Sequence, residues 1–231
     1  MPGTRGGLAV LALADSRFPN GGHVHSGGVE EAVARGLITD VGHLREFLFG
    51  RLRSAGLVAA VFAAAAAHAA AGRRADWPGL DAELDARTPS PAQRAASRAQ
   101  GWGLLRAGRA AWQSQALSDL VSTTGRPHHP LVLGVLITAS GAGARDAALV
   151  AGYHSVSGPS SAAVRLLGLD PFAVNALLIE LTAELDDLAD TASASAHLPP
   201  ADLPAPGSPA LDLLAESHDH HHREEVRLFA S

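Results

Sequence analysis

The longest uncharged stretch of the chain does most to limit its fold. Nineteen residues without a charge, SAGLVAAVFAAAAAHAAAG, lie between Arg53 and Arg73. This length could span a bilayer, but alanine gains little free energy on transfer to lipid, and His68 lies within the stretch. We therefore expect a helix buried in a protein core. Its small side chains would allow neighbouring helices to pack closely.

The rest of the chain also has the periodicity of helices. We expect helices over 41–52, 91–112 and 171–190, which begin after Asp40, at Ser90-Pro91 and at Asp170-Pro171, respectively. The first helix can be interrupted at Gly56. Segment 128–143 is rich in β-branched residues, but its length favours a buried helix. The expected apolar faces are, in order of helix, Leu44, Phe47, Leu48 and Leu52; Ala95, Ala99, Trp102 and Leu105 or Arg106; Val174, Leu177, Leu178, Leu181, Leu185 and Leu188.

These patterns predict an all-α protein with a single helical bundle domain over residues 1–192. Five prolines and many small residues between 193 and 209 predict an Ala/Ser/Pro-rich linker, and residues 210–231 would form a flexible, His-rich C-terminal tail. The apolar segment 8–13 is at the short limit for a signal peptide and overlaps the cleavage-like Ala12-Leu13-Ala14, so we expect no signal peptide. We expect a cytoplasmic protein that does not enter a membrane.

Composition excludes several chemistries. The chain has no cysteine, and all 18 of its basic residues are arginine. Without cysteine there is no disulfide, thiolate nucleophile or Cys-type zinc site, and without lysine there is no Schiff base and no P-loop. The basic excess of residues 1–165 is small and scattered, so we expect no nucleic-acid binding.

The glycine-rich loop PNGGHVHSGGVEEAV at 19–33 is the first candidate site. Its glycines predict a tight turn, and Ser26 can cap a following helix that has Glu30 near its positive end. His23 and His25 have the spacing of a metal-ligand pair in some hydrolases. A local turn is the favoured interpretation, because such hydrolases also need a lysine and a series of barrel strands that this sequence lacks.

Two further clusters lie near the C-terminus. His218, His220, His221 and His222 carry neutral imidazoles of the kind that bind nickel, and His218 and His222 are one helical turn apart. The alternative is a solvated tail without a physiological metal. An acidic run comprising Glu180, Glu184, Asp186, Asp187 and Asp190 is either a solvated helix face or a docking surface for an arginine-rich partner.

Segment 11–38 resembles the N-terminal signature of the urease accessory protein UreF family. The matching residues, in order, are Asp15, Ser16, Pro19, Gly21, Gly22, His25, Ser26, Gly28 and Glu30. Looser likenesses, within an overall span of roughly 8–190, are carried by Ser97, Gly101 and Leu104, by His129, Pro130 and Gly134, and by Ala163, Arg165, Leu166 and Leu169. The sequence departs from the family where His23 replaces an aromatic residue, Gly168 a proline and Asp170-Pro171 a Gly-Gln pair.

The resemblance implies a non-enzymatic, all-helical homodimer with no catalytic residues and no intrinsic cofactor. Such a protein binds UreD (also called UreH) and recruits the GTPase UreG, so that nickel, held at most transiently, reaches apo-urease. The matching residues imply partner contacts by His25, Ser26, Glu30 and Arg165, and the family's C-terminal docking segment implies contacts by Arg227, Leu228 and Phe229. Two alternatives stay open: a small metal-dependent hydrolase that uses His23 and His25, and a stand-alone nickel-binding protein.

Overall fold

The computed structural model describes residues 6–15, 17–18, 26–72 and 75–228, and the side chains of this set up to His221. Every regular element in these ranges is helical, which confirms the all-α prediction. The α-helices are α1 (Gly7–Ala14), α2 (Val29–Ala34), α3 (Val41–Arg51), α4 (Leu57–Ala71), α5 (Trp77–Ala86), α6 (Pro91–Ala111), α7 (Gln115–Thr124), α8 (His129–Ala139), α9 (Ala144–Leu167), α10 (Pro171–Glu180), α11 (Thr182–Ser195) and α12 (Pro209–Leu228). A π-helical turn, Leu52–Gly56, joins α3 to α4, and a 3₁₀ turn, Pro200–Asp202, precedes α12.

Helix α4 forms the centre of the molecule and packs against α8, α9 and α11. Every side chain from Ala60 to Ala67 is buried. Gly134 of α8 crosses α4 so closely that a Cβ atom added to it would lie 2.2 Å from the carbonyl oxygen of Ala63. At the same crossing, the Thr138 hydroxyl donates a 3.0 Å hydrogen bond to the carbonyl of Ala67. The alanine-rich segment is therefore the core helix that the sequence predicted.

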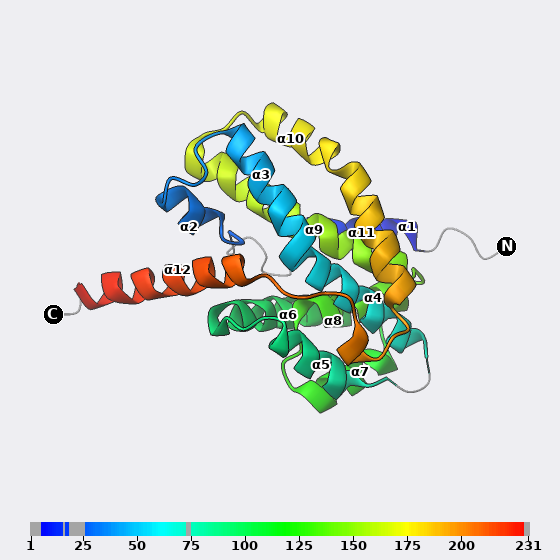
Figure 1. The fold of residues 1–231 in the computed structure, drawn as a ribbon. Coiled ribbons are helices and arrows are strands. Elements are labelled where there is room, and N and C mark those ends of the chain that lie inside the picture. The colour runs from blue at the N-terminus through cyan, green and yellow to red at the C-terminus, as the bar shows by residue number, and fades with distance from the viewer. Residues whose placement is uncertain (1–5, 16, 19–25, 73–74, 229–231) are drawn as a thin grey trace.

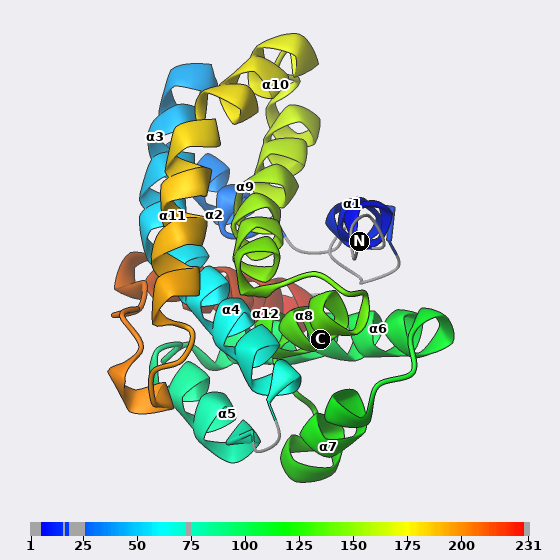
Figure 2. The same ribbon diagram turned by 90° about the vertical axis from the view of Figure 1, so that its right-hand side faces the viewer.

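The views in Figures 1 and 2 show how the other helices surround α4. Helices α3, α9 and α11 lie roughly side by side, and α10 joins two of them at their far end. Helices α5, α6, α7 and α8 gather at the opposite end of the molecule. Helix α12 lies along one side between α2 and α6 and projects beyond both (Figure 1).

One helical stretch in the described ranges, Val41–Ala71, is long and apolar enough to cross a bilayer. It runs through α3, the π-helical turn and α4 without a break. However, 56% of its most apolar window is buried inside the protein. Burial against α8, α9 and α11 accounts for this apolar composition, as it does for the core helix of a globular protein.

The predicted helix starts are confirmed. The Asp40 side chain accepts a hydrogen bond from the His43 amide, and Ser90 accepts one from the Gln93 amide. The single helix predicted over 171–190 is instead divided at Leu181 into α10 and α11. At the end of α9, Gly168 has a φ of +65° and ends the helix in the left-handed conformation, after which Asp170 caps α10.

The apolar face predicted for α6 is confirmed at Leu105 and wrong at Ala95, Ala99 and Trp102, which are exposed. The buried residues of α6 are Gly101, Leu104, Leu105 and Gly108. Two glycines thus occupy the contact face, where they bring the backbone of α6 against α8.

The segment expected as a linker packs against the domain. Its first three residues, 193–195, complete α11, and Leu203 and Ala205 are buried. The guanidinium of Arg87 donates hydrogen bonds to the carbonyls of Pro200 and Ala201, at 3.2 and 3.0 Å. Helix α12 begins at Pro209, the last residue of the expected linker, takes in residues 210–228 of the expected tail, and packs on α2 and α6.

Candidate functional site

A cavity of about 1050 Å³ opens between α2, α6, α9 and α12. Its wall brings together segments far apart in the sequence: the end of the glycine-rich loop, the junction of α3 and α4, the start of α8 and the inner face of α12. The polar side chains that line it include Ser26, Glu30, Glu31, Arg51, His129, His154, Arg165, Glu216 and His218.

Glycines shape the loop that leads into α2. Gly27 and Gly28 have φ angles of +64° and +93°, in the left-handed region that L-residues rarely adopt. A Cβ atom at Gly27 would also lie 3.0 Å from Cγ of Pro159. Gly28, and not the predicted Ser26, is the N-cap residue of α2, but the Ser26 hydroxyl accepts a hydrogen bond from the Glu30 amide at 3.3 Å and so satisfies an N–H group in the first turn.

Arg51 ties this loop to α9. Its Nε donates to the carbonyl of Ser155 at 2.8 Å, and its Nη1 donates to the carbonyl of Gly27 at 2.6 Å. The Ser155 carbonyl is available because the residue four positions later, Pro159, has no N–H to offer it. Burial lowers the pKa of Arg51 to about 10, so the side chain remains a cation at neutral pH.

Helix α12 borders the cavity and is attached to α6 through two carboxylates. Oδ1 of Asp212 accepts hydrogen bonds from the Ser90 amide and from Nε2 of Gln93, both at 3.2 Å. Oε1 of Glu216 accepts from the Ala92 amide at 3.0 Å and from the Ser90 hydroxyl. The first amides of a helix lack partners within it and attract negative charge, so α12 completes the start of α6. Burial raises the pKa of Asp212, and the nearby Glu216 raises it further.

The histidine-rich part of α12 faces α2. Nδ1 of His221 lies 3.5 Å from Oε2 of Glu31, and Nδ1 of His218 lies 4.0 Å from the same oxygen. Nε2 of His218 is 3.9 Å from Oε2 of Glu30, and the other oxygen of Glu31 accepts a 2.7 Å hydrogen bond from Arg35. We call these four residues, Glu30, Glu31, His218 and His221, the α2–α12 junction.

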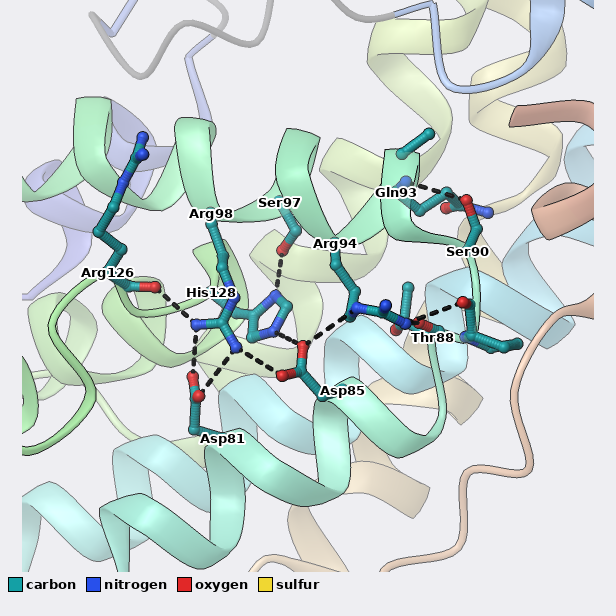
Figure 3. A network of polar contacts seen from close by, with 12 residues as sticks. Asp81, Asp85, Thr88, Ser90, Gln93, Arg94, Ser97, Arg98, Arg126 and His128 are labelled. Atoms are coloured by element: carbon teal, nitrogen blue, oxygen red, sulfur yellow. Dashed lines mark hydrogen bonds and ion pairs between the residues drawn. The ribbon is translucent and has the colours of Figure 1, made fainter. Parts of the chain in front are cut away.

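A second polar cluster joins α5, α6 and the start of α8 (Figure 3). His128 is buried, with Nε2 at 2.8 Å from Oδ1 of Asp85 and Nδ1 at 3.0 Å from the Ser97 hydroxyl. Arg98 binds Asp85 at 2.8 Å and Asp81 at 2.9 Å. Burial and the positive charge of Arg98 lower the pKa of His128.

Ser97, His128 and Asp85 are the residue types of a hydrolase triad, but their setting does not suit nucleophilic catalysis. Ser97 lies in the middle of α6, where the backbone amides are engaged in the helix and cannot form an oxyanion hole. Asp85 also pairs with Arg98. The cluster is better explained as a polar cross-link between three helices. Sequence analysis named Ser97 and the His-His-Pro run that opens α8, but it did not bring them together with Asp85 and Arg98.

Two more imidazoles lie in the cavity wall. The ring centres of His129 and His154 are 5.7 Å apart. The carbonyls of Leu13 and Ala14 face His154, but neither ring nitrogen makes a hydrogen bond of ordinary geometry with a described residue. Burial lowers both pKa values, that of His129 to about 3, so both rings are neutral at pH 7.

Comparison with known proteins places this architecture in a family. The UreF sequence profile matches residues 38–182, which run from just before α3 to the first residue of α11. The chain belongs to the UreF family. It is 46% identical over 222 residues to the urease accessory protein UreF of Mycolicibacterium vanbaalenii, which covers 96% of this chain and 97% of that protein. The proteins of the same name from Mycobacterium marinum and Mycobacterium tuberculosis are 44% and 42% identical, over 96% and 97% of this chain.

The UreF resemblance seen in the sequence is therefore confirmed. The matched range leaves out the N-terminal signature and α12, although alignments over 96% of the chain take in the signature loop and most of α12. Within the matched range, two UreF-like motifs meet at the cross-link. Gly101 of α6 lies against the start of α8, and a Cβ atom added to Gly101 would lie 2.2 Å from the Pro127 carbonyl oxygen. One turn earlier in α6, the Ser97 hydroxyl is hydrogen-bonded to His128.

The structure brings together part of the predicted UreF site. Ser26, Glu30 and Arg165 all line the cavity, and His218 joins them from α12. His220 lies on the exposed surface of α12. Three of the predicted residues, His23, His25 and Phe229, lie outside the described residues. Arg227, Leu228 and His222 belong to α12, but their side chains are outside the described set.

The acidic run is less isolated than the sequence indicated. Arg145 of α9 binds Asp190 at 2.6 Å and Asp186 at 2.8 Å, and Arg45 of α3 lies 3.4 Å from Glu180. These arginines come from other helices, so no local pattern could reveal them. The charge available for an arginine-rich partner is correspondingly reduced.

Proposed function

We propose that this protein is a urease accessory protein without catalytic activity of its own. In this proposal it binds UreD (UreH) and recruits the GTPase UreG, so that nickel is delivered to apo-urease. The observation that carries the proposal is the near end-to-end similarity to proteins named urease accessory protein UreF. Its site of action would be the cytoplasm.

The arrangement of the candidate residues supports a docking role. Ser26 and Glu30 at the start of α2, Arg165 on α9 and the inner face of α12 surround one cavity. They are held there by Arg51, by the glycine loop and by the two carboxylates of α12. A rigid frame of this kind can present a surface to a partner without a large ordering entropy on binding.

The non-catalytic part of the proposal is supported by the chemistry of the chain. Lysine is absent, so the chain cannot form the P-loop that a GTPase requires. The polar cross-link around His128 does not offer an activated nucleophile with an oxyanion hole. Nucleotide hydrolysis is therefore assigned to UreG, and nickel is treated as cargo.

We also propose that the protein is a homodimer. Phe172 and Ile179 of α10 are 85% and 66% exposed, and Leu166 lies nearby at the end of α9. Large apolar side chains exposed in this way are typical of interaction surfaces. Replacing Phe172 and Ile179 with serine should convert a dimer, measured by light scattering at micromolar concentration, to a monomer.

The deciding experiment reconstitutes urease maturation. The chain should restore nickel-dependent urease activity in a host that lacks its own UreF, and it should co-purify with UreD and UreG. A variant without residues 223–231 should lose UreD while keeping its melting temperature, because the deletion spares Asp212 and Glu216. Failure to restore activity when UreD, UreG and nickel are present would refute the proposal, and full UreD binding by the truncated chain would refute the role of the tail.

A further inference from the structure

Basic charge is concentrated in the part of the chain that carries α6. Residues 87–145 contain seven arginines and a single acid, Asp119. Helix α6 itself has four arginines and no acid over its 21 residues. This region can therefore neutralise few of its own arginines, and the fold decides which of them remain available to a partner.

Four of the seven arginines are paired with acids. The pairs are Arg87–Glu83, Arg94–Asp85, Arg98–Asp81, Arg98–Asp85, Arg145–Asp186 and Arg145–Asp190. The other three, Arg106, Arg109 and Arg126, are exposed, and their guanidinium groups form no hydrogen bond or ion pair with any residue that the structure describes. These three cations are the charge left for a partner.

Two of them share one face of α6 with a tryptophan. Positions 102, 106 and 109 are separated by four and three residues, so Trp102, Arg106 and Arg109 lie in a row along the helix. Trp102 is 40% exposed. We call these three residues the α6 stripe. Ala95 and Ala99 continue the same face toward the start of α6, where they line the cavity.

The stripe lies away from the attachment of α12. The hydrogen bonds from α6 to the carboxylates of α12 involve residues 90–93, and Figure 2 shows the end of α6 reaching the edge of the molecule below α1. Arg126 adds its cation beside the helix. Its carbonyl accepts a 2.7 Å hydrogen bond from Arg98, one turn before Trp102, and its side chain extends away from Asp81 (Figure 3).

A solvated helix face would not account for this combination of residues. Arg109 lies in the last turn of α6, where a cation stabilises the negative end of the helix. Arg106 lies before that turn, and the exposed indole of Trp102 would gain free energy if it were covered. Tryptophan and arginine are among the residues most enriched where protein interfaces gain most of their binding energy.

We propose that the α6 stripe is a docking surface for an acidic helix of a protein partner. Carboxylates one turn apart on that helix would bind Arg106 and Arg109, because the N–H groups of a guanidinium match the two oxygens of a carboxylate. An apolar side chain of the partner would cover the indole of Trp102. The stripe does not line the cavity, so this surface goes beyond the proposed function.

The charge of the whole chain favours a protein over other anions. A nucleic acid or an anionic membrane presents many charges over a wide area, and the net charge of −5 on this chain repels them. A single acidic helix needs only the local row of residues, and it has the length and the side-chain spacing to follow that row.

The first test uses a designed probe, a fluorescein-labelled helical peptide of about 20 residues with glutamate at every fourth position among alanine and leucine. Its binding to the full-length protein is measured by fluorescence anisotropy. Arg106→Glu should weaken binding about tenfold, and Trp102→Ala should weaken it about fivefold. The matched control is Arg53→Glu, which makes the same charge change at an exposed arginine outside α6 and should change the affinity less than about twofold.

The second test measures the dependence on salt. The Debye length falls from about 30 Å at 0.01 M to about 10 Å at 0.1 M salt, so peptide binding to the unaltered protein should weaken about tenfold over this range. A variant that carries both Arg106→Gln and Arg109→Gln should show a much smaller dependence. Glutamine has a helix propensity close to that of arginine, so an unchanged melting temperature confirms that α6 is intact.

Several outcomes would overturn the proposal. The unaltered protein does not bind the peptide, or Arg53→Glu weakens binding as much as Arg106→Glu, which would leave only a general effect of charge. Single-stranded DNA or phosphatidylglycerol vesicles bind the stripe more tightly than the peptide does. The stripe variants convert a dimer to a monomer in light scattering, which would assign the stripe to contacts between copies of this chain. None of these readouts uses urease or its maturation proteins, so failure here is distinguishable from failure of the proposed function.

Discussion

The crossing of α4 and α8 makes a quantitative prediction through Gly134. In Gly134→Ala the new Cβ would lie 2.2 Å from the carbonyl oxygen of Ala63 and 2.8 Å from the amide nitrogen of Ala67. Both obstacles are backbone atoms, so no side chain can rotate away and the helices must separate by about 1 Å. Overpacking of this kind destabilises by about 1–3 kcal/mol. Loss of the Thr138 hydrogen bond to Ala67 adds about 1 kcal/mol, and the better helix propensity of alanine returns a similar amount.

The expected net effect is a loss of about 2 kcal/mol in the free energy of unfolding, or about 4–8 °C in melting temperature for a chain of this size. The matched control is Gly50→Ala in α3, where an added Cβ meets nothing within 4 Å. It should be stabilising by up to about 1 kcal/mol, because only helix propensity changes. Urea denaturation followed by circular dichroism measures both variants. A Gly134→Ala protein as stable as Gly50→Ala would refute the close-contact argument.

Three further predictions concern buried polar groups. Arg51→Met leaves the carbonyls of Ser155 and Gly27 without donors and should lower the free energy of unfolding by about 2 kcal/mol. Amide hydrogen exchange at residues 26–28 should become faster. Unchanged exchange there would contradict the role of Arg51 in holding the glycine loop to α9. The pKa of His129 is about 3 in the folded protein and about 6.5 in the unfolded chain, so between these values only the unfolded chain binds the proton. The free energy of unfolding should therefore fall by up to about 1.4 kcal/mol per pH unit as the pH drops below 6. In denaturation experiments, the free energy of unfolding of His129→Gln should depend less steeply on pH. Ser97→Ala should lower stability by about 1 kcal/mol and leave urease maturation unchanged, whereas loss of maturation in a stably folded variant would favour a chemical role for that hydroxyl.

Local signals in the sequence were sufficient for helix starts and for the central helix. Asp40 and Ser90 bond to amides three residues away, so the information lies within one turn. Apart from Leu105, the buried face of α6 was missed because hydrophobic periodicity gives no weight to glycine. A Cβ atom added at Gly108 would lie 2.5 Å from the Leu136 side chain. Helix α6 can therefore approach α8 this closely only because position 108 has no side chain.

The site was predictable only in part. Ser26 and Glu30 were identified from a sequence motif, but their neighbours come from distant segments. The hydrogen bond from Arg51 to Ser155 spans 104 positions and depends on the missing N–H of Pro159, which looks in sequence like a helix breaker. The attachment of α12 was likewise hidden, because Asp212 and Glu216 appeared as ordinary acids of a polar tail.

The attachment of α12 also has a consequence for the order in which the protein folds. The first turn of α6 is completed by Asp212 and Glu216, which follow Ser90 by 122 and 126 positions. During synthesis, the Ser90 and Ala92 amides at the start of α6 therefore have no α12 carboxylate to bind until more than a hundred further residues have been made. Any later event that lifts α12 would return that turn to its unfinished state.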